Sequence, residues 1–94
     1  MIRVVAHISA LSSKIEELKA VALALAVPTR QEPGCREYEW HQNTADPTDI
    51  TCIEEWESDA ALDAHLASPH VKAALSRTPE LATGVDIRRY KLLG

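Results

Sequence analysis

DITCIEEWESDAALDAHLASPH, at residues 49–70, passes from a strand-like to a helix-like pattern within one short segment. Residues 49–57 are rich in β-branched and aromatic side chains, which predicts a β-strand. Because neighbouring side chains of a strand point to opposite faces, Glu54 and Glu55 cannot both point inward. One face of this strand is expected to carry Ile50, Cys52, Glu54 and Trp56.

The helical part of this segment begins at residues 58–59 and is expected to break once. The Ser-Pro pair at residues 68–69 places a capping residue before a proline at the first helical position, which predicts that a helix starts again there. Before the break, three residues recur at helical spacing and share one side of the helix: Leu62, His65 and Leu66.

The remaining sequence predicts three more strands and one more helix. These are a strand at 2–9, a helix from Lys14 through Leu25 that is capped by Ser12 or Ser13 and ended by Pro28, a strand at 35–42 joined by a turn at 43–48 to the strand at 49–57, and a strand at 85–93 that follows Gly84. The order β-α-β-β-α-β is that of the ferredoxin-like fold, an α+β antiparallel sheet with helices on one face.

Composition indicates one globular domain, residues 1–94, with a modest core. The chain has no Phe, two Trp and two Tyr, and a core this limited favours a homodimer. The net charge of −4 without basic runs argues against nucleic-acid binding, and no apolar stretch is long enough for a membrane span. Met1 precedes no secretory signal pattern, and two cysteines are too few for a disulfide framework, so we expect a cytoplasmic protein.

Several side chains could carry chemistry, and each has a purely structural alternative. Glu54 shares a strand face with Trp56 and could enter a pocket, or it could pair with a basic residue at the sheet edge. Tyr38 and Trp40 share a face of their strand and could be core residues or contact a substrate. His65 lies on the apolar side of its helix, where it is either a satisfied buried residue or a proton-transfer group.

No metal site is predicted. His70 follows His65 by five residues, which on a regular helix separates the two rings by about 140°. The two histidines are therefore not expected to bind the same metal ion. The sequence also contains no zinc-binding spacing and no glycine-rich phosphate loop.

Residues 54–70, EEWESDAALDAHLASPH, resemble the signature of the antibiotic biosynthesis monooxygenase family. Pro-Gly-Cys at 33–35, Tyr38 and the Arg-Tyr pair at 89–90 are similar to flanking parts of that family. The resemblance implies a dimeric α+β barrel with a pocket between sheet and helices. It also implies oxidation of phenols, quinols or anthrone-like rings by O2 without a cofactor, with Trp56 as a pocket wall and His65 as base or hydrogen-bond donor.

The resemblance is to the small quinol-monooxygenase-like members rather than to two other branches. The pocket Asn, Tyr and Arg of the aromatic polyketide branch correspond here to Cys52, Leu62 and Leu75. The Asn and axial His of the haem-degrading branch correspond to Ile8 and Leu75.

We therefore predict a cofactor-free monooxygenase whose partners are a small aromatic or quinol substrate, O2 and a second copy of the chain. The catalytic residue is His65, and the substrate pocket contains Trp56, Glu54, Cys52, Leu62, Tyr38 and His70. Two alternatives remain: an isomerase or other proton-transfer enzyme acting on a small carbonyl compound, and a dimeric small-molecule binding protein without turnover.

Overall fold

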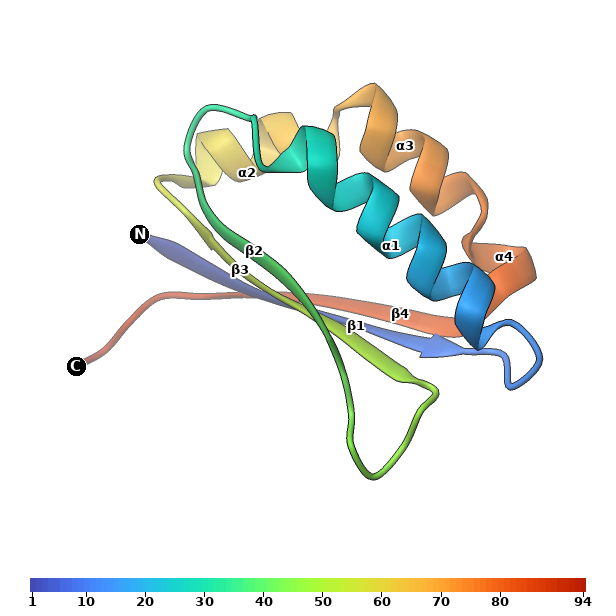
Figure 1. The fold of residues 1–94 in the computed structure, drawn as a ribbon. Helices are drawn as coiled ribbons and strands as arrows, with labels where there is room; N and C mark the ends of the chain where they lie inside the picture. Colours follow the sequence, from blue (N-terminus) through green and yellow to red (C-terminus); the bar gives the residue numbers. More distant parts are fainter.

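The computed structural model describes residues 1–94 and has the ferredoxin-like α+β order that the sequence predicts. The elements are β1 (Ile2–Ala10), α1 (Ile15–Thr29), β2 (Cys35–Gln42), β3 (Asp49–Trp56), α2 (Asp59–Leu66), α3 (Pro69–Ser76), α4 (Thr78–Leu81) and β4 (Ala82–Tyr90). The strands form one antiparallel sheet in the order β2-β3-β1-β4, and all the helices lie on one face of it (Figure 1).

The register of β3 separates its side chains as strand alternation predicts. Each of the alternate residues Ile50, Cys52, Glu54 and Trp56 is at most 4% exposed beneath the helices. Val4 and Ala6 of β1 and Tyr38 of β2 lie on the same side, and these residues form one core cluster with Trp56 and Leu62. Burial of this apolar face holds the helices on the sheet.

The second helical region is broken at the predicted place. Ser58 begins α2 and Ser68 begins α3, and the hydroxyl of each serine accepts a hydrogen bond from the backbone N–H three residues later. Pro69 occupies the start of α3, where its missing N–H costs nothing. The sequence analysis missed the short helix α4, which leads directly into β4.

Three predicted boundaries are wrong. Neither Ser12 nor Ser13 caps α1, whose cap residue is Lys14, without a side-chain hydrogen bond. Pro28 does not end α1, which continues to Thr29. A proline lacks one N–H donor but keeps a helical φ, and the N–H of Arg30 still donates to the Ala26 carbonyl at 3.0 Å. The last strand lies at Ala82–Tyr90 rather than at residues 85–93, so Gly84 lies within β4, whose first residue, Ala82, already pairs with β1.

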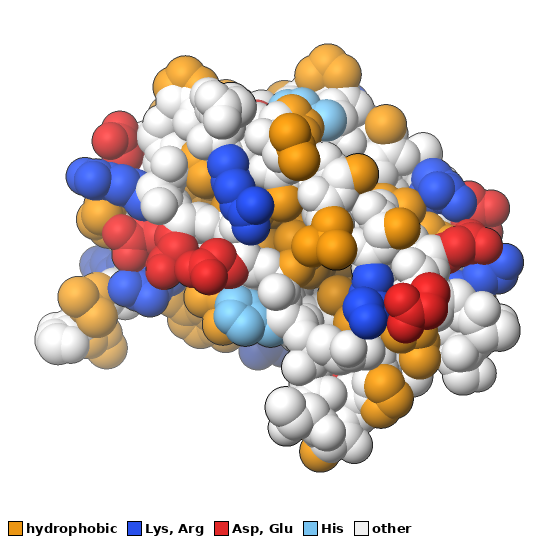
Figure 2. Space-filling view, viewed as in Figure 1, with side chains coloured by type: hydrophobic (Ala, Val, Ile, Leu, Met, Phe, Trp, Pro, Cys, Tyr) orange, Lys and Arg blue, Asp and Glu red, His pale blue; other side chains and the backbone are white.

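No helix is both long and apolar enough to cross a membrane. The two cysteines, Cys35 and Cys52, are free thiols, as predicted. Apolar side chains gather near the middle of the face shown in Figure 2, and charged side chains lie toward its margins.

Candidate active site

An apolar cavity of about 70 Å³ lies between the helices and the sheet. Its walls come from all four helices on one side and from all four strands on the other. Leu75, Val85 and Ile87 line it and are each about two-fifths exposed, which places its open side between α3 and the edge strand β4. An apolar lining of this kind suits apolar groups and disfavours water.

Two acid–base side chains, Glu54 and His65, lie in the wall of this cavity together with the phenol of Tyr38. Each of the three is at most 4% exposed. All other ionisable side chains lie outside the lining. Proton transfer to or from a bound ligand is therefore restricted to these groups.

Glu54 is a buried carboxyl with one strong donor. Trp56 Nε1 donates to Glu54 Oε1 at 2.9 Å. Burial nevertheless raises the pKa of Glu54 from 4.5 to about 7, because loss of hydration outweighs the hydrogen bonds from Trp56 and Cys52. Near neutral pH, this side chain can therefore either donate or accept a proton.

One ring nitrogen of His65, Nδ1, contacts the carboxylate of Glu32, and the other, Nε2, is free. Its Nδ1 lies 2.6 Å from Glu32 Oε2. Because an ionised carboxylate only accepts hydrogen bonds, Nδ1 carries the proton and Nε2 keeps a lone pair. Burial lowers the pKa of His65, against the raising effect of the Glu32 hydrogen bond and charge. The imidazole is thus a neutral base at neutral pH.

Aromatic neighbours fix the plane of the His65 ring. Its centroid lies 4.7 Å from that of Trp56, with 35° between the planes. The Tyr38 ring meets it edge-on at 5.5 Å. With Glu32 at one nitrogen and rings on two sides, the imidazole cannot rotate freely, so its Nε2 is held in one direction.

The structure places the predicted site residues in two groups. Tyr38, Glu54, Leu62 and His65 line the cavity. Cys52, Trp56 and His70, which the sequence also predicts in the pocket, lie outside this lining. Trp56 is wholly buried against His65, so its indole supports the site instead of forming its wall. Cys52 is also wholly buried, in the core cluster beneath the cavity.

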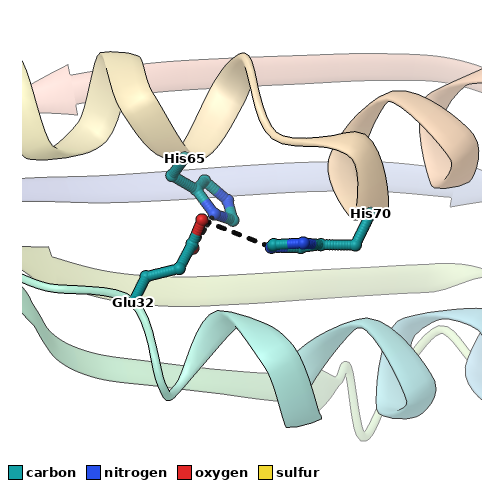
Figure 3. Close-up of side chains that lie close together, drawn as sticks. All are labelled: Glu32, His65 and His70. Atoms are coloured by element: carbon teal, nitrogen blue, oxygen red, sulfur yellow. Dashed lines mark hydrogen bonds and ion pairs between the residues drawn. The ribbon is translucent and has the colours of Figure 1, made fainter.

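His70 lies close to His65, contrary to the predicted separation. The rings are 6.2 Å apart between centroids, and Glu32 Oε1 lies 3.3 Å from His70 Nε2. The expected angle of about 140° assumed a continuous helix, whereas the chain changes direction between α2 and α3. Figure 3 shows both imidazoles directed at Glu32.

Glu32 is the site residue that sequence reasoning missed. It lies between α1 and β2, two residues before Gly34, whose φ of 85° lies in the left-handed region. A Cβ at Gly34 would lie 2.7 Å from the Ala61 Cβ of α2, so glycine allows this loop to approach α2 closely. The Pro-Gly pair at 33–34 signals a tight turn, but nothing in the sequence indicates that the residue before it reaches His65.

Comparison with known proteins gives a consistent result over most of the chain. The family model described as antibiotic biosynthesis monooxygenase matches residues 1–77. The Synechocystis protein sll1783, itself uncharacterized, is 30% identical over 90 residues, which are 95% of this chain and 61% of that protein. The Mycobacterium tuberculosis protein named "Putative monooxygenase Rv0793" is 38% identical over 66 residues, which are 70% of this chain and 64% of that protein.

Solved structures agree with the observed fold. The structure of Rv0793 superposes with a TM-score of 0.93 at 29% identity, covering 99% of this chain and 95% of that one. PA3566 from Pseudomonas aeruginosa gives a TM-score of 0.91 at 34% identity, covering 99% and 94%. By the sequence alignments, the chain spans less than two thirds of the length of the two curated relatives, sll1783 and Rv0793.

Proposed function

The chain belongs to the antibiotic biosynthesis monooxygenase family, and from this premise we propose that it oxidises a small aromatic, phenol or quinol with O2 and without a cofactor. The observation that carries the proposal is the Glu32–His65 pair at the wall of an apolar cavity. A neutral, oriented imidazole is the group needed to take a proton from a phenolic hydroxyl. The substrate itself is the electron donor.

The proposed reaction begins with proton transfer to His65 Nε2. Glu32 stabilises the imidazolium that forms, as a carboxylate does in other acid–base pairs. The quinol anion gives one electron to O2, which leaves a semiquinone radical beside superoxide. Combination of these two radicals forms a carbon–oxygen bond. His65 returns its proton to the peroxide that forms, and loss of water then leaves a hydroxyquinone, so one quinol and one O2 give one hydroxyquinone and one water.

The cavity supports this sequence in two ways. Its apolar lining excludes water from the reactive intermediate and strengthens electrostatic interactions within the site. Glu54 can hydrogen-bond to a substrate oxygen opposite the base, because its raised pKa leaves it partly protonated near pH 7.

Oxygen uptake with a panel of reduced quinols and small phenols tests the proposal. His65→Ala should lower turnover by roughly 10²–10⁴-fold. His41→Ala is a matched control, because His41 is exposed and hydrogen-bonds only to a carbonyl of its own strand. Equal uptake by the wild type and the His65 variant, both folded, would remove His65 from this role.

The same panel separates the two alternatives. Conversion of a small carbonyl compound to an isomer, without O2 consumption, would identify a proton-transfer enzyme. Tight ligand binding with neither reaction would identify a binding protein.

We also propose that residues 1–94 form one domain that pairs with a second copy. Proteins of this family are typically homodimers. The sheet face away from the helices is uncovered and carries partly exposed apolar residues, among them Ile53 and Tyr90. Sedimentation equilibrium of the wild type and of Ile53→Lys tests this: the wild type should be dimeric, and the variant should dissociate more readily. A monomeric wild type would contradict the proposal.

A further inference from the structure

Three separate elements bring potential metal ligands to one point. Glu32 lies in the loop after α1, His65 lies on α2 and His70 lies on α3. One ligand atom from each side chain can be chosen so that all three lie within 4.8 Å of one another. Figure 3 shows the imidazoles approaching the same carboxylate from different elements.

This group is not fully satisfied by its own hydrogen bonds. Glu32 Oε2 accepts from His65 Nδ1 at 2.6 Å. His70 Nε2 lies 3.3 Å from Glu32 Oε1, yet its geometry is not that of a hydrogen bond, and this buried nitrogen has no other partner. A buried nitrogen without a hydrogen-bond partner destabilises the folded state. A positive ion placed among the three side chains would remove that destabilisation.

The electrostatic surroundings favour a cation. The Glu32 carboxylate lies beside both imidazoles, and its charge would attract a positive ion placed among the three side chains. Two imidazole rings can bind one divalent ion through nitrogen lone pairs while both rings remain neutral ligands.

We propose that Glu32, His65 and His70 form a binding site for one divalent transition-metal ion, of which Zn²⁺ is the representative. Two imidazole nitrogens and one carboxylate oxygen suit Zn²⁺ and the neighbouring late first-row ions. Mg²⁺ and Ca²⁺ prefer oxygen ligands throughout. The site adjoins the apolar cavity, because His65 belongs to both, whereas Glu32 and His70 lie outside the cavity lining.

Small movements bring the three side chains into metal-binding geometry. Zn²⁺ binds nitrogen and carboxylate oxygen at about 2.0–2.2 Å, which separates tetrahedral ligands by roughly 3.4 Å. The contacts of Glu32 use different oxygens, since Oε2 lies 2.6 Å from His65 Nδ1 and Oε1 lies 3.3 Å from His70 Nε2. One ligand atom from each side chain lies within 4.8 Å of the other two, so each pair must shift by less than about 1.5 Å to reach the tetrahedral separation. The His70 side chain is 26% exposed, which leaves room for a water molecule as the fourth ligand.

The experiment is a metal titration of the metal-free protein, residues 1–94, without substrate. Co²⁺ is added first, because its visible absorption reports coordination geometry, and Zn²⁺ then competes for the same site. Mg²⁺ is the negative probe. The variants are His70→Ala and Glu32→Gln, and His41→Ala is the control for binding by an exposed histidine.

The wild type and His41→Ala should bind one Co²⁺ per chain with a tetrahedral spectrum that Zn²⁺ abolishes. His70→Ala and Glu32→Gln should each weaken Zn²⁺ binding by at least about 10-fold, since changing even a residue that only supports a ligand costs roughly 10–100-fold. Circular dichroism shows whether each variant is folded, and Glu32→Gln keeps the size of the side chain. The proposal is overturned by the absence of stoichiometric binding, or by equal affinities in the wild type and the folded Glu32→Gln variant.

Discussion

Replacing the buried Glu54 carboxyl by an amide should change how the stability of the protein depends on pH. In the folded protein Glu54 keeps its proton up to about pH 7, because burial raises its pKa from 4.5. The unfolded chain releases that proton at its ordinary pKa. Between these two values the folded state binds more protons, so the free energy of unfolding falls as the pH rises, and above pH 7 the contribution is constant.

The size of the effect follows from the two pKa values. Each unit of pKa difference corresponds to about 1.4 kcal/mol, so Glu54 should lower the free energy of unfolding by about 3 kcal/mol between pH 4.5 and pH 7. Glu54→Gln keeps the size and an acceptor for Trp56 Nε1 but removes the titration. The variant should therefore gain about 3 kcal/mol relative to wild type across this interval, whatever its stability at pH 4.5.

Urea unfolding at closely spaced pH values measures this difference. His65 has a lowered pKa and therefore contributes stability that is lost as the pH falls below 6.5, but this effect is present in both proteins and cancels. Protein concentration is held constant, because dimerisation would add to the apparent stability. Glu55→Gln is the matched control from the opposite face of β3. A difference between Glu54→Gln and wild type that does not vary with pH would refute the assignment of a raised pKa to Glu54.

Four further outcomes follow from the site and its supports. Trp56→Phe should cost about 1–3 kcal/mol in urea unfolding, because the buried carboxyl loses its indole donor; an unchanged midpoint would contradict this. Gly34→Ala should destabilise by more than about 1 kcal/mol, whereas Gly84→Ala, where a Cβ meets nothing within 4 Å, should change the melting temperature far less. Glu32→Gln should shift the rising limb of the plot of kcat/KM against pH to lower pH, because Glu32 raises the pKa of His65. An unchanged limb would show that Glu32 does not influence the pKa of the catalytic base. Zn²⁺ should inhibit oxygen uptake, because a metal at Nδ1 places the imidazole proton on Nε2; this outcome rests on the proposed function, and binding without inhibition would count against His65 as the base.

The fold and half of the site could be predicted because they depend on local patterns. Alternation along β3 assigned Glu54 to the buried face, and helical spacing placed His65 beside Leu62 on the side facing the core. The Ser-Pro pair located the break between α2 and α3, because capping chemistry acts over three or four residues. Each of these signals is contained within one element.

The other half depends on how separate elements pack. Glu32 is 33 residues from His65 in the sequence, and only the close approach of the loop at Gly34 to α2 joins them. Trp56 was expected at the cavity because strand alternation correctly placed its side chain on the helix-covered face of β3. Alternation does not predict how deeply a side chain is buried on that face, however, and the His65 ring lies over the indole.

The break between α2 and α3 determines which chemistry this fold can hold. In an unbroken helix, His65 and His70 would point in different directions, and Glu32 would serve one imidazole alone. The change of direction at Ser68 instead brings both rings to one carboxylate. Glu32 then has two competing uses: it orients His65 as a base, or it binds a metal ion together with both histidines. Because His65 Nδ1 cannot hold a proton and a metal ion at once, occupancy of the metal site and activity of the base should be mutually exclusive.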